Sequence, residues 1–419
     1  MSEWNEADLR AEVRTWLEEN WDPNRGLVEW RNILADSGWG MPTWPSAWYG
    51  RDLPVGLGPV VEEAFRDFGA IGVARSGVRM LVAATLLEHG SDLHKSKFLR
   101  RILTGEDTWC QLFSEPGSGS DLAGLTTRAE FQGNQWVVSG QKVWSTSAHK
   151  ADWGVLLART DWDAHKHAGL SYFVIDMSQP GVEARPLQQM NGYASFNEVF
   201  MTEATVPPDM LVGETGQGWQ IATTTLMHER RNADALRQWG RPDAGGKGQI
   251  YEEEAAEIAT VMEPYRWYPQ RAGRVDLILK RARDTGKLDD PVVRQEIAKL
   301  LTMSKSAEWT ARRARAAQEL GRPQGPEGSL GKLASSHVAR AAAQVHTMLS
   351  GSDAMLAGED GAEDGLIAEI LLSVPATSIA GGTDEIQRNI ISERVLKMPK
   401  ENRVDTGRPF SEVRKNTVG

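Results

Sequence analysis

The segment that decides the fold is a run rich in valine and tryptophan, Gln135-Trp136-Val137-Val138-Ser139-Gly140-Gln141-Lys142-Val143-Trp144. Branched and aromatic residues of this kind favour strands, and a glycine inside such a run is typical of a turn. The segment therefore predicts a strand, a turn at Gly140 and a second strand.

Further short apolar runs lie on both sides of it, at residues 153–158, 171–176 and 198–201. Turn-rich segments separate these runs, and no helical pattern stands between them. Strands without intervening helices predict an antiparallel sandwich or barrel rather than a unit of alternating strands and helices.

Helical periodicity flanks this region. Near the N-terminus, Leu9, Val13 and Leu17 recur at four-residue steps, and after Gly218 the same period returns and lasts to about Lys397. The sequence thus predicts an α+β protein in four parts. These are an N-terminal helical domain at 1–110, a middle β domain at 111–215, a C-terminal helical domain at 216–400 and a tail at 401–419.

Composition narrows the class of protein. The 419 residues are 40% hydrophobic and 25% charged, as in soluble globular proteins, and the net charge of −10 argues against nucleic acid or anionic membranes as main partners. The lone Cys110 excludes an internal disulfide framework. Neither a signal peptide nor a membrane span is apparent, so we expect a soluble, cytoplasmic protein without a metal centre. The 16 tryptophans are expected to fill core positions.

A small-residue segment carries the strongest chemical signal: Gln111-Leu112-Phe113-Ser114-Glu115-Pro116-Gly117-Ser118-Gly119-Ser120-Asp121. Glycine and serine let backbone N–H groups approach a polar or anionic ligand closely, although ordinary hairpin loops have the same composition. Its position, at the start of the β domain and ahead of residues 140–146, favours ligand binding.

Four spaced motifs then define a resemblance. They are Ser-Glu-Pro-Gly-Ser-Gly-Ser-Asp at 114–121, Gly-Gln-Lys-Val-Trp-Ser-Thr at 140–146, Val-Gly-Glu at 212–214 followed by Gly-Gln-Gly-Trp at 216–219, and Gly-Gly-Thr-Asp-Glu-Ile-Gln-Arg at 381–388. Together they resemble the acyl-CoA dehydrogenase family, over nearly the whole chain. The resemblance implies an N-terminal helical domain, a middle antiparallel β-barrel domain and a C-terminal four-helix bundle, with FAD as cofactor.

The resemblance also assigns the cofactor site. The implied FAD-binding residues are Gln111, Ser114, Gly119, Ser120, Trp144, Thr146, Thr383 and Glu385. Among them, Trp144 would cover a face of the flavin ring and Thr146 would hydrogen-bond near its N5 atom. The acyl-CoA substrate would meet Ser120, Arg230 and the backbone N–H of Gly381.

The catalytic base departs from the usual family pattern. Family members remove the α proton of an acyl thioester while the β hydrogen leaves as hydride to flavin N5. Most place the catalytic Glu directly before the last Gly-Thr, where this chain has Gly381. Isovaleryl-CoA and bacterial sterol side-chain dehydrogenases instead carry it in Leu-x-x-Glu-Arg on the first helix after the β domain. Leu226-Met227-His228-Glu229-Arg230 matches, so the resemblance implies Glu229 as base.

Two other family features are weak here. The stretch 281–286 keeps arginines but lacks the phenylalanine that normally precedes its glycine, and 347–353 replaces the usual adenosine-diphosphate loop. The half of a flavin site that one subunit donates to its neighbour is therefore in doubt. Either a homodimer or homotetramer, or an α2β2 heterotetramer with a related subunit, fits this pattern. Glycine at 381 leaves room for a branched or ring-bearing acyl group.

Three functions remain open at this point. The leading expectation is an acyl-CoA dehydrogenase of fatty acid or sterol catabolism that forms a trans-2-enoyl-CoA and passes electrons to an electron-transferring flavoprotein. The alternatives are a flavin-dependent monooxygenase or oxidase on the same fold, and a non-catalytic subunit of a heteromeric dehydrogenase.

Overall fold

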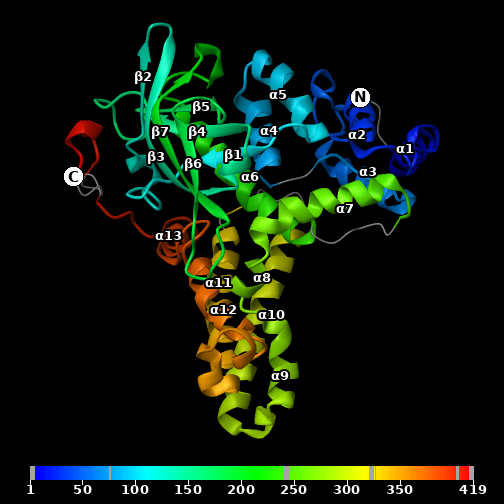
Figure 1. Ribbon diagram of the computed structural model, residues 1–419, viewed down its shortest axis with the longest axis vertical. Helices are drawn as coiled ribbons and strands as arrows, with labels where there is room; N and C mark the ends of the chain where they lie inside the picture. Colours follow the sequence, from blue (N-terminus) through cyan, green and yellow to red (C-terminus); the bar gives the residue numbers. More distant parts are fainter. Residues whose placement is uncertain are drawn as a thin grey trace. The chain divides into compact units, whose positions relative to one another are not determined.

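The computed structural model describes residues 5–74, 77–239, 246–319, 325, 327–402 and 405–414, with only the backbone for 230–239, 315, 318, 319 and 327. The described residues group into two compact units (Figure 1). The first lies within Met1–Leu187, Ser195–Pro264 and Asp405–Gly419, and the second within Gln188–Ala194 and Tyr265–Val404. None of the described helices combines the length and the apolar character that crossing a membrane would need.

The first unit begins with five helices: α1 Glu6–Asn20, α2 Leu27–Ser37, α3 Gly58–Phe68, α4 Gly77–His89 and α5 Asp92–Thr104. In α1 the Asn5 side chain accepts from Ala7 N at 2.9 Å, which caps the helix, and the predicted stripe of Leu9, Val13 and Leu17 is fully buried. Several tryptophans fill core positions as predicted, among them Trp30, which is fully buried and donates its indole N–H to Ile71 O. Trp144 and Trp309 contradict the prediction, because both rings are exposed.

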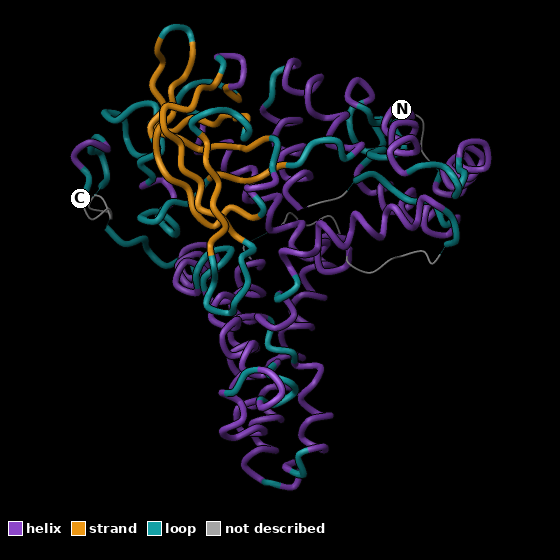
Figure 2. The backbone as a smooth tube through the Cα atoms, viewed as in Figure 1, coloured by secondary structure: helices purple, strands orange, loops and turns teal. Residues whose placement is uncertain are grey.

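One eight-stranded sheet follows (Figure 2). Its strands are β1 Trp109–Leu112, β2 Arg128–Gln132, β3 Gln135–Thr146, β4 Trp153–Arg159, β5 Leu170–Asp176, β6 Val182–Leu187, β7 Phe196–Val206 and β8 Leu211–Val212. The spatial order is β6-β7-β3-β2-β4-β5-β8, with β1 beside β4. The pairings are antiparallel except for β1–β4 and β2–β4, which are parallel, so the sheet is mixed where the sequence predicted an antiparallel one.

The predicted turn at Gly140 is wrong, because β3 runs unbroken from Gln135 to Thr146. Gly140 instead lies at a shift of register against β7, with φ of +157°. A Cβ atom there would lie 2.5 Å from Thr127 Oγ1, so the glycine allows β3 to approach Thr127 closely. Glycine in a strand pattern thus marks an irregularity rather than a reversal of the chain.

Helices α6 Gly218–Trp239 and α7 Gln249–Met262 complete the helical part of the first unit. Glu257 of α7 binds two buried arginines, Arg31 of α2 at 2.5 Å and Arg79 of α4 at 3.2 Å. Burial alone would raise the pKa of Glu257, but the two guanidinium groups hold it below its usual range. These ion pairs tie α7 to the N-terminal helices.

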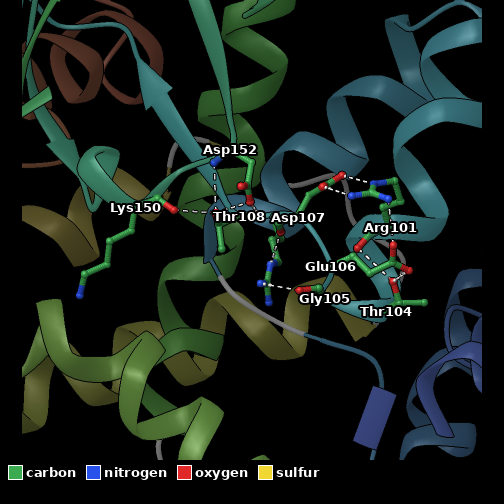
Figure 3. A network of polar contacts seen from close by, with 9 residues as sticks. Arg101, Thr104, Gly105, Glu106, Asp107, Thr108, Lys150 and Asp152 are labelled. Carbon is green, nitrogen blue, oxygen red and sulfur yellow. Dashed lines mark hydrogen bonds and ion pairs between the residues drawn. The ribbon is translucent and has the colours of Figure 1, made fainter. Parts of the chain in front are cut away.

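A polar network holds the chain where α5 leads into β1 (Figure 3). Arg101 binds both carboxylate oxygens of the buried Asp107, at 2.6 and 2.7 Å. Arg79 donates to the backbone oxygens of Gly105 and Asp107, and Thr108 N donates to Asp152 at 2.8 Å. The connection is therefore fixed on both sides, and it sets the position of β1.

Replacing Asp107 with Asn is expected to lower the free energy of unfolding by about 1–2 kcal/mol, because one charge-assisted bond to Arg101 is lost in a buried position. Urea denaturation followed by tryptophan fluorescence measures the change. Glu106→Gln is the matched control, since Glu106 binds the same arginine from a more exposed position. Equal losses in both variants would contradict a special role for Asp107.

The second unit is built from α8 Tyr268–Arg271, α9 Ile278–Asp284, α10 Pro291–Glu319, α11 Glu327–Ser350, α12 Leu366–Ser373 and α13 Asp384–Ile390, with short 3-10 turns between them. Asp290 accepts from Val292 N at 2.8 Å and so caps α10. The start of α10, at Val293 and Ile297, shares a core with the end of α11, at Val345 and Leu349. The two long helices are therefore antiparallel.

Candidate active site

Two of the motifs lie side by side in the first unit. The Gly/Ser loop, residues 113–127, leaves β1 just after Gln111, and Ser114 O accepts from Val143 N of β3 at 2.9 Å. This bond brings Ser114 next to the strand that carries Trp144 and Thr146. Gln111, Ser114 and Thr146 are half-buried, whereas Gly119 and Ser120 are exposed.

Trp144 has a strained backbone and an exposed ring. Its φ is +64°, in the left-handed region that bulky residues avoid, at a second shift of register between Lys142 and Ser145. The indole is 56% exposed and meets Phe196 edge to face, with ring centroids 5.8 Å apart. Backbone strain of this kind is concentrated at functional sites, where it aims a side chain.

A buried ion pair underlies the loop and the strand. Lys142 is fully buried, and its Nζ donates to Glu115 Oε1 at 2.9 Å, Phe113 O at 3.0 Å and Leu157 O at 2.8 Å. Glu115 also accepts from the backbone N–H groups of Thr126 and Thr127. Burial would raise the pKa of Glu115, but Lys142 and these donors lower it to about 2. Both ends of the Gly/Ser loop are thus bonded to one fixed charge.

These residues fit a flavin. An exposed indole offers an aromatic face, Gly119 has no atom within 4 Å of where its Cβ would be, and Ser114 and Ser120 offer hydroxyl groups. The buried hydroxyl of Ser145, beside Trp144, finds no hydrogen-bond partner among the described residues. A planar ring with polar edges matches this combination of an aromatic face and hydrogen-bonding groups.

The predicted base lies on α6 of the same unit. Glu229 is half-buried and stands one helical turn after Thr225, which is fully buried. Thr225 Oγ1 lies 2.9 Å from Thr85 Oγ1 of α4 and 3.1 Å from the Tyr172 hydroxyl of β5. This cluster fixes α6 against both α4 and the sheet, directly ahead of Glu229. The side chain of Arg230, predicted to meet the CoA, lies outside the described residues.

The remaining predicted residues lie in the second unit, which is described by itself. Gly381 and Gly382 both have positive φ, of +69° and +89°. Thr383 caps α13 by accepting from Ile386 N, and the exposed Glu385 binds Arg388 at 3.2 Å. The glycine pair therefore forms a turn that leads directly into a capped helix.

Arg281, in the weak 281–286 stretch, is engaged within its own unit. It is buried and donates to Ser350 Oγ at 2.6 Å, with His346 Nδ1 2.8 Å and Glu363 3.2 Å away. Burial, together with this guanidinium, lowers the pKa of His346 to about 4, so its imidazole is neutral near pH 7.

The sequence reading missed the groups that support the site. Glu115 and Lys142 stand inside the quoted motifs, and a charged residue within an otherwise apolar strand pattern is the signal that points to a buried pair. Thr225 and Tyr172 carry no local signal, because their contacts join three elements. Cys110 packs as a small apolar residue: it is fully buried, and burial raises the pKa of its thiol.

Three family models match successive parts of the chain: "Acyl-CoA dehydrogenase, N-terminal domain" at residues 2–106, "Acyl-CoA dehydrogenase, middle domain" at 110–204 and "Acyl-CoA dehydrogenase, C-terminal domain" at 272–396. Among characterised proteins, the acyl-CoA dehydrogenase IpdE1 of Mycobacterium tuberculosis is 32% identical over 417 residues, covering 94% of this chain and 98% of IpdE1.

Solved structures share the fold. The Tcur3481-Tcur3483 steroid ACAD has a TM-score of 0.63 at 24% identity and covers 94% of this chain and 98% of its own. The ChsE4-ChsE5 complex of Mycobacterium tuberculosis has a TM-score of 0.60 at 22% identity and covers 96% of this chain and 100% of its own.

The helical, sheet and helical parts define a three-domain flavoprotein dehydrogenase and confirm the predicted fold class. The chain belongs to the acyl-CoA dehydrogenase family. It is accordingly an oxidoreductase that acts on the CH–CH group of an acyl-CoA, and its cofactor is FAD.

Proposed function

We propose that the chain dehydrogenates a bulky acyl-CoA, branched or ring-bearing, with Glu229 as the catalytic base. Two observations carry this proposal: position 381 is glycine, which has no proton acceptor, and Glu229 is half-buried on a helix fixed by Thr225. A carboxylate held in place by its helix is a suitable general base for a proton on carbon.

Each remaining residue has a role in this proposal. FAD, when bound, supplies the oxidising power of the reaction. Gln111, Ser114, Gly119, Ser120, Trp144 and Thr146 would hold its ring and chain. Thr383 and Glu385 are proposed as further FAD-binding residues. The Gly381 N–H would donate to the thioester oxygen and stabilise the negative charge that develops there as the α proton leaves.

Two observations support a bulky substrate. Within the described part of the second unit, a Cβ at Gly381 would meet Lys332 Cε at 3.8 Å and nothing nearer, so the position is open there. A relative of the same fold is a steroid ACAD. We infer that the acyl group carries a ring or branch close to the thioester.

The assembly is proposed to be heteromeric. Arg281, which opens the weak 281–286 stretch, is engaged inside its own unit by His346 and Ser350, so its guanidinium is already bound there. The ChsE4-ChsE5 complex is a structural neighbour formed by two proteins. We propose an α2β2 tetramer with a related subunit. We further propose the domain boundaries given above, a cytoplasmic location and an electron-transferring flavoprotein as electron acceptor.

The first test is the visible spectrum of the purified chain, alone and with candidate partner subunits, before and after addition of acyl-CoAs. Ring-bearing or branched esters are expected to bleach the bound flavin at least about tenfold faster than a straight-chain ester of equal carbon number, because a pocket separates substrates by about 1–3 kcal/mol. Faster bleaching by the straight chain would overturn the substrate class. Rapid reoxidation by air would favour an oxidase.

A further inference from the structure

The C-terminal segment 405–414, here called the clasp, docks on the middle domain although the sequence predicts only a tail there. Figure 1 shows this segment in red beside the strands. Phe410 N donates to Ala164 O at 3.0 Å and Ser411 N donates to Trp162 O at 2.8 Å, so the clasp follows the turn between β4 and β5. Phe410 is 1% exposed.

The ring of Phe410 covers a buried arginine. The guanidinium carbon of Arg159 lies 3.4 Å from the ring centroid, and Arg159 itself is fully buried. The same guanidinium donates to two carbonyl oxygens of the Gly/Ser loop, Ala123 O at 2.7 Å and Leu125 O at 3.2 Å. A cation between an aromatic face and backbone carbonyls is stabilised from both sides. The clasp therefore covers the outer face of Arg159, the arginine that holds the Gly/Ser loop.

An ion-pair network through Lys166 also links the clasp to the Gly/Ser loop. Asp405 of the clasp, 8% exposed, binds Lys166 Nζ at 2.5 Å, and the same ammonium group binds Asp121 of the Gly/Ser loop at 3.0 Å. Asp121 directly follows Ser120, an assigned FAD-binding residue. Lys166 thus bridges the clasp and the loop.

We propose that the clasp is a positioning element of the FAD site, which sets the affinity for FAD by holding residues 121–125 of the Gly/Ser loop through Arg159 and Lys166. Lys142 and Glu115 hold both ends of that loop, and the clasp holds residues 121–125 between them. This inference rests on the assignment of the Gly/Ser loop to FAD, but not on the identity of the base or substrate.

The test compares Phe410→Ala and Asp405→Asn with the wild-type full chain, and with the partner subunit present if FAD binding needs it. We expect the Kd for FAD to rise about tenfold in Phe410→Ala and about threefold in Asp405→Asn, as the loss of one or two contacts that act on FAD through the loop predicts. In the FAD-free protein, amide hydrogen exchange should accelerate in residues 115–126 and stay unchanged in α10. Glu412→Gln, at an exposed position of the clasp, is the control.

Phe410→Leu guards against misfolding, because it keeps an apolar side chain over Arg159 and removes the aromatic face. Its Kd for FAD should lie between those of wild type and Phe410→Ala. A purely structural clasp would lower the melting temperature and leave the Kd for FAD and the exchange of 115–126 unchanged, which would overturn the proposal. A wild-type assembly that binds no FAD would also overturn it. A wild-type assembly that binds FAD but oxidises no acyl-CoA contradicts the proposed function, and the clasp is then judged by the Kd alone.

Discussion

Replacing Glu229 with Gln is expected to slow flavin reduction by an acyl-CoA about 10²–10⁴-fold, the usual contribution of a general base. The amide has the same shape but accepts no proton from carbon. Because the flavin-binding residues of the first unit lie on β1, β3 and the Gly/Ser loop, bound FAD and its spectrum should not change. Stopped-flow absorbance during a single turnover measures the rate. Glu214→Gln, an exposed carboxylate just before α6, is the matched control.

A reduction rate within about threefold of wild type in Glu229→Gln would rule out Glu229 as the base, since that is far below the effect of a general base. The double variant Glu229→Gln/Gly381→Glu then tests the other family position. Space does not prevent a side chain at 381, but φ of +69° strains any residue except glycine. We therefore expect weak recovery at most, and full recovery would show that the two base positions are interchangeable here.

Replacing Lys142 with Met is expected to lower the free energy of unfolding by about 3–5 kcal/mol, because removing one partner strands a buried charge. Glu115 would keep its bonds from Thr126 and Thr127, but Phe113 O and Leu157 O would lose their donor. Urea denaturation followed by tryptophan fluorescence measures the loss. Lys150→Met, at an exposed lysine of the same domain, is the control.

The double variant Lys142→Met/Glu115→Gln distinguishes the energy of the Glu115–Lys142 interaction from the energy of each side chain's other contacts. If the pair acts as a unit, the double variant should be less destabilised than the sum of the two single variants. Strict additivity would contradict coupling between the two side chains.

Lowering the pH should reveal the contribution of the Glu115–Lys142 pair to the free energy of unfolding. The pKa of Glu115 is about 2 in the folded chain, below the value of about 4.3 for a free glutamate. A lowered pKa contributes stability that is complete above the unfolded value and is lost as pH falls toward 2. The wild type should therefore lose stability more steeply than Glu115→Gln over that range.

Local patterns predicted the elements better than their connections. The α1 stripe of Leu9, Val13 and Leu17 and the Asp290 cap lie within a few residues of the groups they contact, so periodicity and capping rules suffice. At Gly140 the local rule failed, because the glycine is required by the close approach of Thr127 in the Gly/Ser loop, a contact outside the segment itself.

In the candidate site, too, local patterns predicted some residues and missed others. Ser114 and Trp144 were found through motifs, and a main-chain bond does bring their segments together. The supports of the site were not found, because Thr225 meets Thr85 and Tyr172, and Arg159 meets Phe410, only after the chain has folded. A buried cation whose partners are carbonyl oxygens has no signature in neighbouring residues.

The docking of Phe410 also fixes when the middle domain can complete its folding during synthesis. Asp163 and Ser411 touch across 248 residues of sequence. At translation rates of about 5–20 residues per second, the β4–β5 turn waits about 12–50 seconds on the ribosome before its cover is made. During that interval the nascent middle domain carries Arg159 without its aromatic wall, which makes this turn a natural contact for chaperones.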